Sequence, residues 1–206
     1  MNKNSLLNLS VLTVLCFLSS SLLGKKDISK ELSDLLGKNG LKGWKIPKGN
    51  ENSKWYQVTN NILEVRSGPK KKGSVLWTEK EYRDFELNLE FQFISGTIDS
   101  GIHLRNSDQI QIGISGSLKR DMTCSPYIPG KSYPVEAKNI KKLLKPKNWN
   151  QMRIRAIGPK YTVWLQGEEV MNYKSSSAKE KGPIGIQLHG NRQMAINLKN
   201  IKVQEI

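Results

Sequence analysis

Residues 84–114 read DFELNLEFQFISGTIDSGIHLRNSDQIQIGI, and this stretch decides the fold class. Apolar and polar side chains alternate in three parts of it: Asp84–Ile94, Ser100–Arg105 and Gln109–Ile114. A period of two is typical of a β-strand with one buried face. The stretch therefore predicts three strands in succession, each with an apolar side that faces a core.

The same period continues along the chain on both sides of this stretch. Further strands are predicted at Gln57–Val65, Ser74–Thr78, Asn150–Ala156, Tyr161–Leu165, Ile184–Leu188 and Met194–Val203. Asn60-Asn61 is expected to reverse the chain, because asparagine tolerates positive φ, and a bulge near Lys199-Asn200 is needed to keep the last apolar residues facing inward. Residues 25–40 hold the one helix-like pattern. Many short strands with turn residues between them predict an all-β antiparallel sandwich.

The N-terminus carries a hydrophobic segment. The chain begins Met-Asn-Lys, has no charge from Asn4 to Gly24, and is almost wholly apolar from Val11 to Leu18. This order predicts a cleaved signal peptide at residues 1–24, with a mature chain that begins between Leu22 and Lys25. The protein is then secreted or periplasmic, and residues 25–206 form one domain.

Two alternatives exist for this N-terminal segment. An uncleaved membrane anchor is the first, because the uncharged span reaches the ~20 residues that a bilayer crossing needs. A lipoprotein signal at Cys16 is the second, and Leu15 disfavours it because a small residue is wanted there. Removal of the signal leaves Cys124 as a lone thiol, for which a small buried side chain is a better interpretation than a nucleophile.

The formal net charge of the chain is +15. Such an excess attracts anionic polymers and membrane surfaces. The lysines, however, are scattered over turn-like segments such as residues 70–72 and 138–147, with no helix or aromatic ladder to organise them. Nucleic acid is therefore not an expected partner. An acidic polysaccharide or the cell envelope stays open as a partner.

The alternation assigns polar side chains to strand faces. His103 and Arg105 lie two apart, as do Gln109 and Gln111, and as do Gln187 and His189, while the residues between them are apolar. If these strands share a sheet, they present imidazole, guanidinium and amide groups that suit sugar hydroxyls and developing oxyanions. An ordinary solvated sheet face is the alternative. The segment Ser115–Pro146 is predicted to be one long loop that closes over this face.

Other chemical signatures are few. The sequence has no metal-ligand spacing, phosphate-binding loop or nucleophile elbow, so we expect neither a cofactor nor a metal. The five tryptophans, Trp44, Trp55, Trp77, Trp149 and Trp164, are able to stack on sugar rings, although core packing is expected for most of them.

An ordered set of segments resembles the 3-keto-disaccharide hydrolase domain, a family long catalogued as a domain of unknown function. The resemblance is carried by Leu36–Trp44, Leu76-Trp77-Thr78, Tyr82–Leu87, Ser100–Arg105, Gln109–Ile112, Trp149-Asn150, Gly182–His189 and Asn200-Ile201. It covers nearly all of the chain after residue 24. It implies a concanavalin A-like sandwich, or jelly roll, of the lectin and glucanase superfamily, exported and active on glycosides that are oxidised at C3.

A C3 ketone acidifies the proton on C2, so that a base removes it and the C1 substituent leaves from the enolate. The enzyme hypothesis assigns His103 or His189 as that base, with Arg105, Gln109, Gln111, Gln187, Trp77 and Tyr127 as substrate-binding residues. One departure is clear: Gln109 stands where many relatives carry a glutamate. A non-catalytic glycan-binding module is therefore the main alternative to an enzyme. A basic structural protein of the envelope is a third interpretation.

Overall fold

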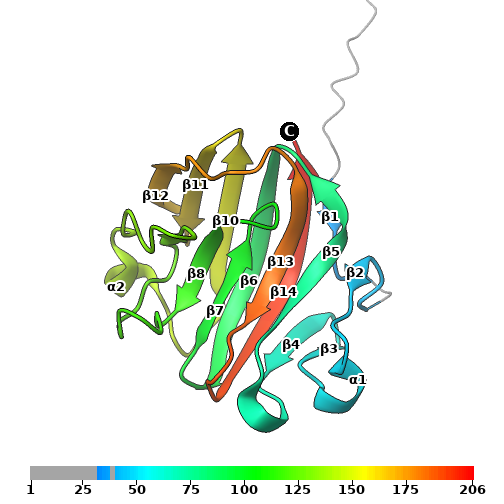
Figure 1. The fold of residues 1–206 in the computed structure, drawn as a ribbon. Helices are drawn as coiled ribbons and strands as arrows, with labels where there is room; N and C mark the ends of the chain where they lie inside the picture. Colours follow the sequence, from blue (N-terminus) through cyan, green and yellow to red (C-terminus); the bar gives the residue numbers. More distant parts are fainter. Residues whose placement is uncertain (1–31, 38–39) are drawn as a thin grey trace, which may run out of the picture.

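The computed structural model describes residues 32–37 and 40–206, and these form two antiparallel sheets packed as layers (Figure 1). Within the described residues, one sheet has eight strands and the other has six. The predicted antiparallel β-sandwich is confirmed.

The eight-stranded sheet has the order β12-β11-β10-β6-β14-β4-β3, and β1 pairs with β14 beside this path. Its strands are β12 (Glu168–Lys174), β11 (Lys160–Leu165), β10 (Asn150–Ile157), β6 (Phe85–Gly96), β14 (Met194–Glu205), β4 (Ile62–Arg66), β3 (Tyr56–Thr59) and β1 (Ser33–Asp34).

The six-stranded sheet has the order β2-β5-β13-β7-β8-β9. Its strands are β2 (Trp44–Lys45), β5 (Ser74–Tyr82), β13 (Gly182–Leu188), β7 (Asp99–His103), β8 (Gln109–Gly113) and β9 (Pro126–Tyr127). Two one-turn helices, α1 (Asn50–Ser53) and α2 (Ile140–Leu143), and a 3₁₀ turn, η1 (Pro69–Lys71), lie in the connections. No helix in the described ranges is long and apolar enough to cross a membrane.

The local turn chemistry follows the sequence. Asn60 and Asn61 have φ of 51° and 60° and join β3 to β4 in a tight hairpin. The register of β14 against β6 shifts between Lys199 and Lys202, with Asn200 at φ 51°, so the predicted bulge is present. The extra residue returns Ile201 and Val203 to the core side, where each is almost fully buried.

The predicted helix at residues 25–40 is wrong where the structure describes it. Ser33–Asp34 form β1 instead, because this segment adds to the edge of β14 through the hydrogen bond from the Leu35 amide to the Ile201 carbonyl, 2.8 Å long. Leu36 then packs into the core. The rest of that pattern, apart from Gly40, and the predicted signal peptide at residues 1–24 lie outside the described residues.

The core forms between the sheets from the apolar parity of the strands. Ile102, Ile110 and Ile186 of the six-stranded sheet are no more than 1% exposed. They face Leu87, Phe91, Ile154 and their neighbours in the eight-stranded sheet as one cluster. Cys124 is a free cysteine at the edge of this core, and burial raises the pKa of its thiol well above the ordinary value. The buried-side-chain interpretation of Cys124 is therefore confirmed.

Arg105 departs from the prediction that it faces outward beside His103. The strand ends at His103, and Arg105 has φ 55°, so its side chain turns inward and is fully buried. Its five N–H donors go to the backbone carbonyl oxygens of Arg83, Ala156, Gly158 and Lys179 and to the Asp84 carboxylate. The guanidinium thus ties the β7–β8 turn to three other turns and has no donor left for a ligand.

Replacement of this guanidinium is expected to destabilise the fold. Arg105→Ala removes the guanidinium donors from four carbonyls and from the Asp84 carboxylate, which should lower the free energy of unfolding by about 3–5 kcal/mol. Urea denaturation measures the change. Arg83→Ala is the matched control: Arg83 forms an exposed ion pair with Glu180, so its loss should cost less than about 0.5 kcal/mol. Equal urea midpoints for the two variants would refute the structural role of Arg105.

Candidate functional site

The face of the six-stranded sheet that points away from the core carries the polar residues. Residues directly opposed in an antiparallel pair share a face. His103 is opposed to Gln109 on one side and to Gly185 on the other, and Gly101 is opposed to Gln111 and Gln187. Trp77 and Tyr127 extend the first of these rows, opposite Gly185 and Gln109. The register therefore places all the candidate site residues except Arg105 and His189 in two adjacent rows, and His189 follows directly after β13.

A cavity of about 540 Å³ opens on this face. Four of the candidate side chains from the strands, Gln109, Gln111, Tyr127 and Gln187, line it together with His189. The segment 115–146 supplies a second wall, so the expected loop does cover the face, although it contains β9 and α2 rather than irregular chain alone. The complete lining is Asp99, Gln109, Gln111, Ser115, Gly116, Ser117, Tyr127, Tyr133, Gln187, His189, Gly190, Asn191 and Arg192.

A row of hydrogen-bonded amides forms the floor of the cavity. The Gln109 amide nitrogen donates to Gln187 Oε1 at 3.2 Å and to Gln111 Oε1 at 2.9 Å. The Gln111 amide nitrogen in turn donates to Asp99 Oδ1 at 2.9 Å. Gly101 makes room for this row, because a Cβ atom there would lie 2.1 Å from the Gln109 amide nitrogen. The floor is thus a set of fixed donors and acceptors, as recognition of hydroxyl groups requires.

His189 stands at the rim of this floor. Its Nδ1 lies 2.7 Å from the Gly190 carbonyl oxygen, to which it donates, so Nε2 is the nitrogen that is able to accept a proton. The side chain is 43% exposed, and Nδ1 lies 3.9 Å from Asp99 Oδ2. The following loop is fixed by hydrogen bonds from Ser67 Oγ to the Arg192 carbonyl and from the Asn191 amide to the Lys71 carbonyl.

His103 occupies a drier position on the same face and does not line the cavity. Its ring lies 5.2 Å from the Trp77 ring, which packs over Gly185, and its Nδ1 lies 3.4 Å from the Ser107 carbonyl oxygen. Its Nε2 is buried without a hydrogen-bond partner in the described structure. Burial lowers the pKa of His103 below the ordinary value, because desolvation disfavours the imidazolium.

Two tyrosines form the aromatic part of the wall. Tyr127 and Tyr133 meet edge to face with ring centroids 5.3 Å apart. Burial raises the pKa of Tyr133, and the nearby Asp99 and Tyr127 raise it further, so its hydroxyl stays protonated. An aromatic wall beside a polar floor is a common arrangement in sugar sites.

Sequence reasoning missed Asp99, Arg192 and Tyr133. Asp99 had a signal, because it lies two and four residues before Gly101 and His103 and so has the same parity. No sequence signal marked Arg192 and Tyr133 as site residues, because both lie in loops, where the directions of side chains follow no period.

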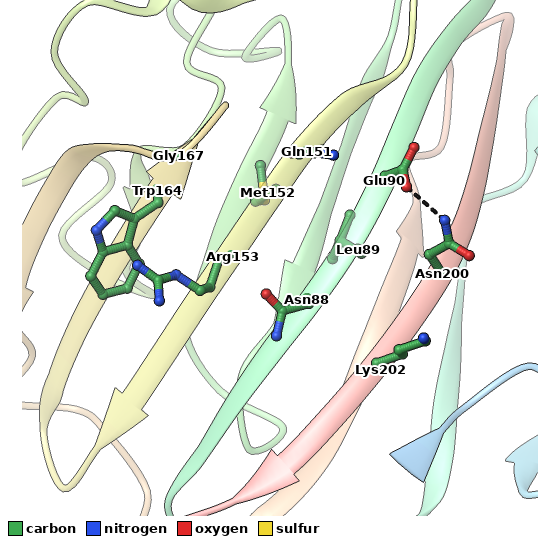
Figure 2. Close-up of a pocket in the computed structure, with 10 residues that line it drawn as sticks. All are labelled: Asn88, Leu89, Glu90, Gln151, Met152, Arg153, Trp164, Gly167, Asn200 and Lys202. Atoms are coloured by element: carbon green, nitrogen blue, oxygen red, sulfur yellow. Dashed lines mark hydrogen bonds between the residues drawn. The ribbon is translucent and has the colours of Figure 1, made fainter. Parts of the chain in front are cut away.

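A second depression of about 450 Å³ lies on the outer face of the eight-stranded sheet, between β11, β10, β6 and β14 (Figure 2). Several of its groups are paired: the Arg153 guanidinium lies 3.8 Å from the centre of the Trp164 ring, and Glu90 accepts from the Asn200 amide at 2.6 Å. Glu90 also lies 3.4 Å from the neighbouring Lys199 Nζ. Lys199 also covers Trp149. We interpret this as a self-satisfied, solvated sheet face and assign the candidate site to the opposite sheet.

The five tryptophans fall into two groups by burial. Trp44 and Trp55 are core residues, while Trp77, Trp149 and Trp164 are half-buried, and none of the five lines the cavity. Within residues 32–37 and 40–206, no group of three or more His, Cys, Asp or Glu side chains is placed to hold a metal ion.

Comparison with known proteins agrees with this architecture. The family model described as the 3-keto-alpha-glucoside-1,2-lyase-like domain matches residues 29–204. No curated protein is significantly similar in sequence.

Solved structures share the fold at low sequence identity. A protein from Parabacteroides distasonis ATCC 8503, described as a "putative glycosyl hydrolase", aligns with a TM-score of 0.64 and 24% identity over 85% of this chain and 100% of its own. The carbohydrate-binding module CBM66 from Bacillus subtilis aligns with a TM-score of 0.51 and 12% identity, over 79% and 96%. A Bacillus subtilis protein with a galectin-like fold aligns with a TM-score of 0.56 and 11% identity, over 85% and 94%.

The clearance at Gly101 leads to a prediction about the floor. Gly101→Ala should displace the Gln109 side chain and lower the free energy of unfolding by about 1–3 kcal/mol, the usual cost of overpacking. The double variant Gly101→Ala/Gln109→Ala tests the cause, because without the Gln109 side chain the added methyl group meets nothing at that distance. A double-mutant cycle by urea denaturation should show coupling between the two positions. Strict additivity would contradict the proposed clash.

The lowered pKa of His103 predicts a pH dependence of stability. The folded state keeps His103 neutral, whereas the unfolded state takes up a proton near pH 6.5. The neutral residue therefore contributes stability above about pH 6.5, and this contribution is lost as the pH falls toward the lowered folded pKa. Urea denaturation of the wild type and of His103→Gln is measured from pH 7.5 to 5. As the pH falls, the free energy of unfolding should decrease more for the wild type than for His103→Gln. A constant difference between the two would contradict the burial argument.

Proposed function

The chain belongs to the 3-keto-alpha-glucoside-1,2-lyase-like domain family, and from this membership we propose that it cleaves 3-keto-glycosides by removing the proton on C2. The observation that carries the proposal is one cavity that joins a proton acceptor to a floor of hydrogen-bond donors, with His189 at the rim and the amides of Gln111 and Gln187 below it. Such a site has the parts that enolate chemistry needs.

The proposed reaction assigns one role to each group. His189 Nε2 takes the C2 proton, and the electron pair of the C–H bond forms the enolate with the C3 carbonyl. The carbonyl then re-forms as the C1–O bond breaks to give a C1–C2 double bond, and the departing aglycone oxygen takes up a proton from His189 or water. The Gln187 amide is the donor to the enolate oxygen, and the tyrosine wall supports the sugar ring. Water adds to the resulting double bond when the overall outcome is hydrolysis.

We assign the base to His189 rather than His103 because of access. His189 borders the cavity and is half-exposed, whereas His103 is buried against Trp77 and outside the lining. Arg105, with every donor bound to its own chain, has no part in the proposal. Trp77 borders His103 and is left as a packing residue.

A glycan-binding module without catalysis is the second candidate, and one observation favours it. Gln109, at the position where many relatives carry a glutamate, is a neutral amide held by three neighbours of the floor. A carboxylate that could act as base is thus absent from β8. For both candidates we propose a location outside the cytoplasm, which the hydrophobic N-terminus predicts, and the N-terminal residue of the purified protein tests that expectation.

Incubation with p-nitrophenyl 3-keto-α-glucoside, followed by absorbance of released p-nitrophenol, distinguishes the two candidates. An enzyme releases the aglycone, and His189→Ala should lower the rate by about 10²–10⁴-fold, the usual contribution of a general base. Arg153→Ala, on the outer face of the other sheet, is the matched control and should keep the wild-type rate. Binding of the glycoside with no release would favour the binding module.

The same assay on His103→Gln decides between the two histidines. A loss comparable to that of His189→Ala would move the base to His103. Wild-type rates in both histidine variants would remove proton transfer by histidine from the proposal altogether.

A further inference from the structure

Asp99 is a buried carboxylate that the proposed chemistry does not use. It is the first residue of β7, it is 2% exposed, and it lines the cavity. Its Oδ1 accepts a hydrogen bond from Gln111, but its Oδ2 is buried without any hydrogen-bond partner among the described residues. A buried carboxylate oxygen without a donor is energetically costly, so such an atom in a cavity points to a ligand that supplies the donor.

The neighbouring cations do not supply that donor. Arg192 Nε lies 3.6 Å from Asp99 Oδ2, and His189 Nδ1 lies 3.9 Å from it and is bound to the Gly190 carbonyl. Both distances are too long for a hydrogen bond, although the Arg192 charge favours a carboxylate here. The two side chains therefore flank Oδ2 without donating a hydrogen bond to it.

Space in front of this oxygen is kept free by a glycine. A Cβ atom at Gly116 would lie 3.1 Å from Asp99 Oδ2 and 3.1 Å from Arg192 Nη2. Any side chain at position 116 would crowd the approach to the carboxylate. The covering loop thus places no side chain at position 116 against the unpaired oxygen.

Asp99 also fixes the direction of the amide row. A carboxylate only accepts, so Gln111 must turn its NH₂ group toward Asp99 and its Oε1 toward Gln109. Gln109 then donates to Gln111 and to Gln187 Oε1, which leaves the Gln187 nitrogen as the outward donor of the row. Asp99 is consequently both the end of the floor and the group that sets its polarity.

We propose that Asp99 Oδ2 accepts a hydrogen bond from a hydroxyl group of the bound sugar and is a specificity-determining residue of the cavity. The inference rests on the proposed carbohydrate function but not on catalysis. The ligand class is a neutral pyranoside with a free hydroxyl group at the position that reaches β7. An ether or a missing oxygen at that position leaves Oδ2 unpaired and loses affinity.

The test compares Asp99→Asn with the wild type, using methyl 3-keto-α-glucoside and its 2-, 4- and 6-deoxy forms as probes. Asparagine keeps the shape and an oxygen for Gln111, but it puts an NH₂ donor in place of Oδ2. Ligand titration followed by NMR gives the dissociation constants, and the methanol signal in the same samples reports turnover. Glu169→Gln, an exposed carboxylate on β12, is the control with the same change of charge.

The expected result is a loss of affinity of about 10- to 100-fold for the parent glycoside in Asp99→Asn, with none in Glu169→Gln, as a hydrogen bond to a charged acceptor predicts. The affinity of the wild type for one deoxy form should be lower than for the parent glycoside by the same factor. Asp99→Asn should not lower the affinity for that deoxy form any further. A role of Asp99 limited to packing would not single out one hydroxyl group.

Several outcomes would overturn the inference. These are equal affinities of Asp99→Asn and wild type, equal binding of all the deoxy forms to the wild type, and no binding of the parent glycoside by the wild type. The deoxy series needs no variant, so it remains decisive if Asp99→Asn fails to fold. Binding that depends on Asp99 without methanol release would instead overturn the proposed cleavage and support the inference.

Discussion

The antiparallel register of β7, β8 and β13 is the constraint on which the rest of the structure depends. Opposed residues share a face, so the pairing of Ile102 with Ile110 and Ile186 sends one set of side chains into the core and the alternate set to the cavity. A slip by one residue would turn the glutamines into the core and the isoleucines toward the cavity. The core and the floor of the site are thus two consequences of one hydrogen-bonding pattern, and the apolar face supplies the free energy that holds the polar face in place.

Two buried charged residues on adjacent parts of this sheet illustrate how burial separates structure from function. Arg105 is fully buried with every donor satisfied by its own chain, so it is a structural tie between turns. Asp99 is nearly as buried and lines the cavity, but one of its oxygens has no donor among the described residues. Because a buried charge without hydrogen-bond partners costs more free energy than one whose partners are all present, hydrogen-bond accounting distinguishes the two where residue type alone does not.

The positive charge of the chain lies mostly outside the candidate site. On the outer face of the eight-stranded sheet, Arg153, Arg155 and Lys199 are paired with Glu86, Glu90 and tryptophan rings. Most lysines lie exposed on turns. The cavity, in contrast, is lined by amides, hydroxyls and aromatic rings with one carboxylate and one arginine, a composition that suits a neutral polyhydroxylated ligand.

The sequence by itself determined the strands, their turns and the face on which most of the site lies, because the period of two and the φ preferences of asparagine and glycine are local properties. It also determined which glutamines share a face. Only the tertiary structure decided that β13 lies beside β7, that Arg105 turns inward at a positive φ, and that Asp99, Arg192 and Tyr133 join the cavity. These depend on pairing between distant segments and on loop conformations, which have no period to read. The helix predicted near residues 32–37 is wrong because of such long-range pairing: this segment pairs with β14 as a strand, and that pairing outweighs a weak local preference for a helix.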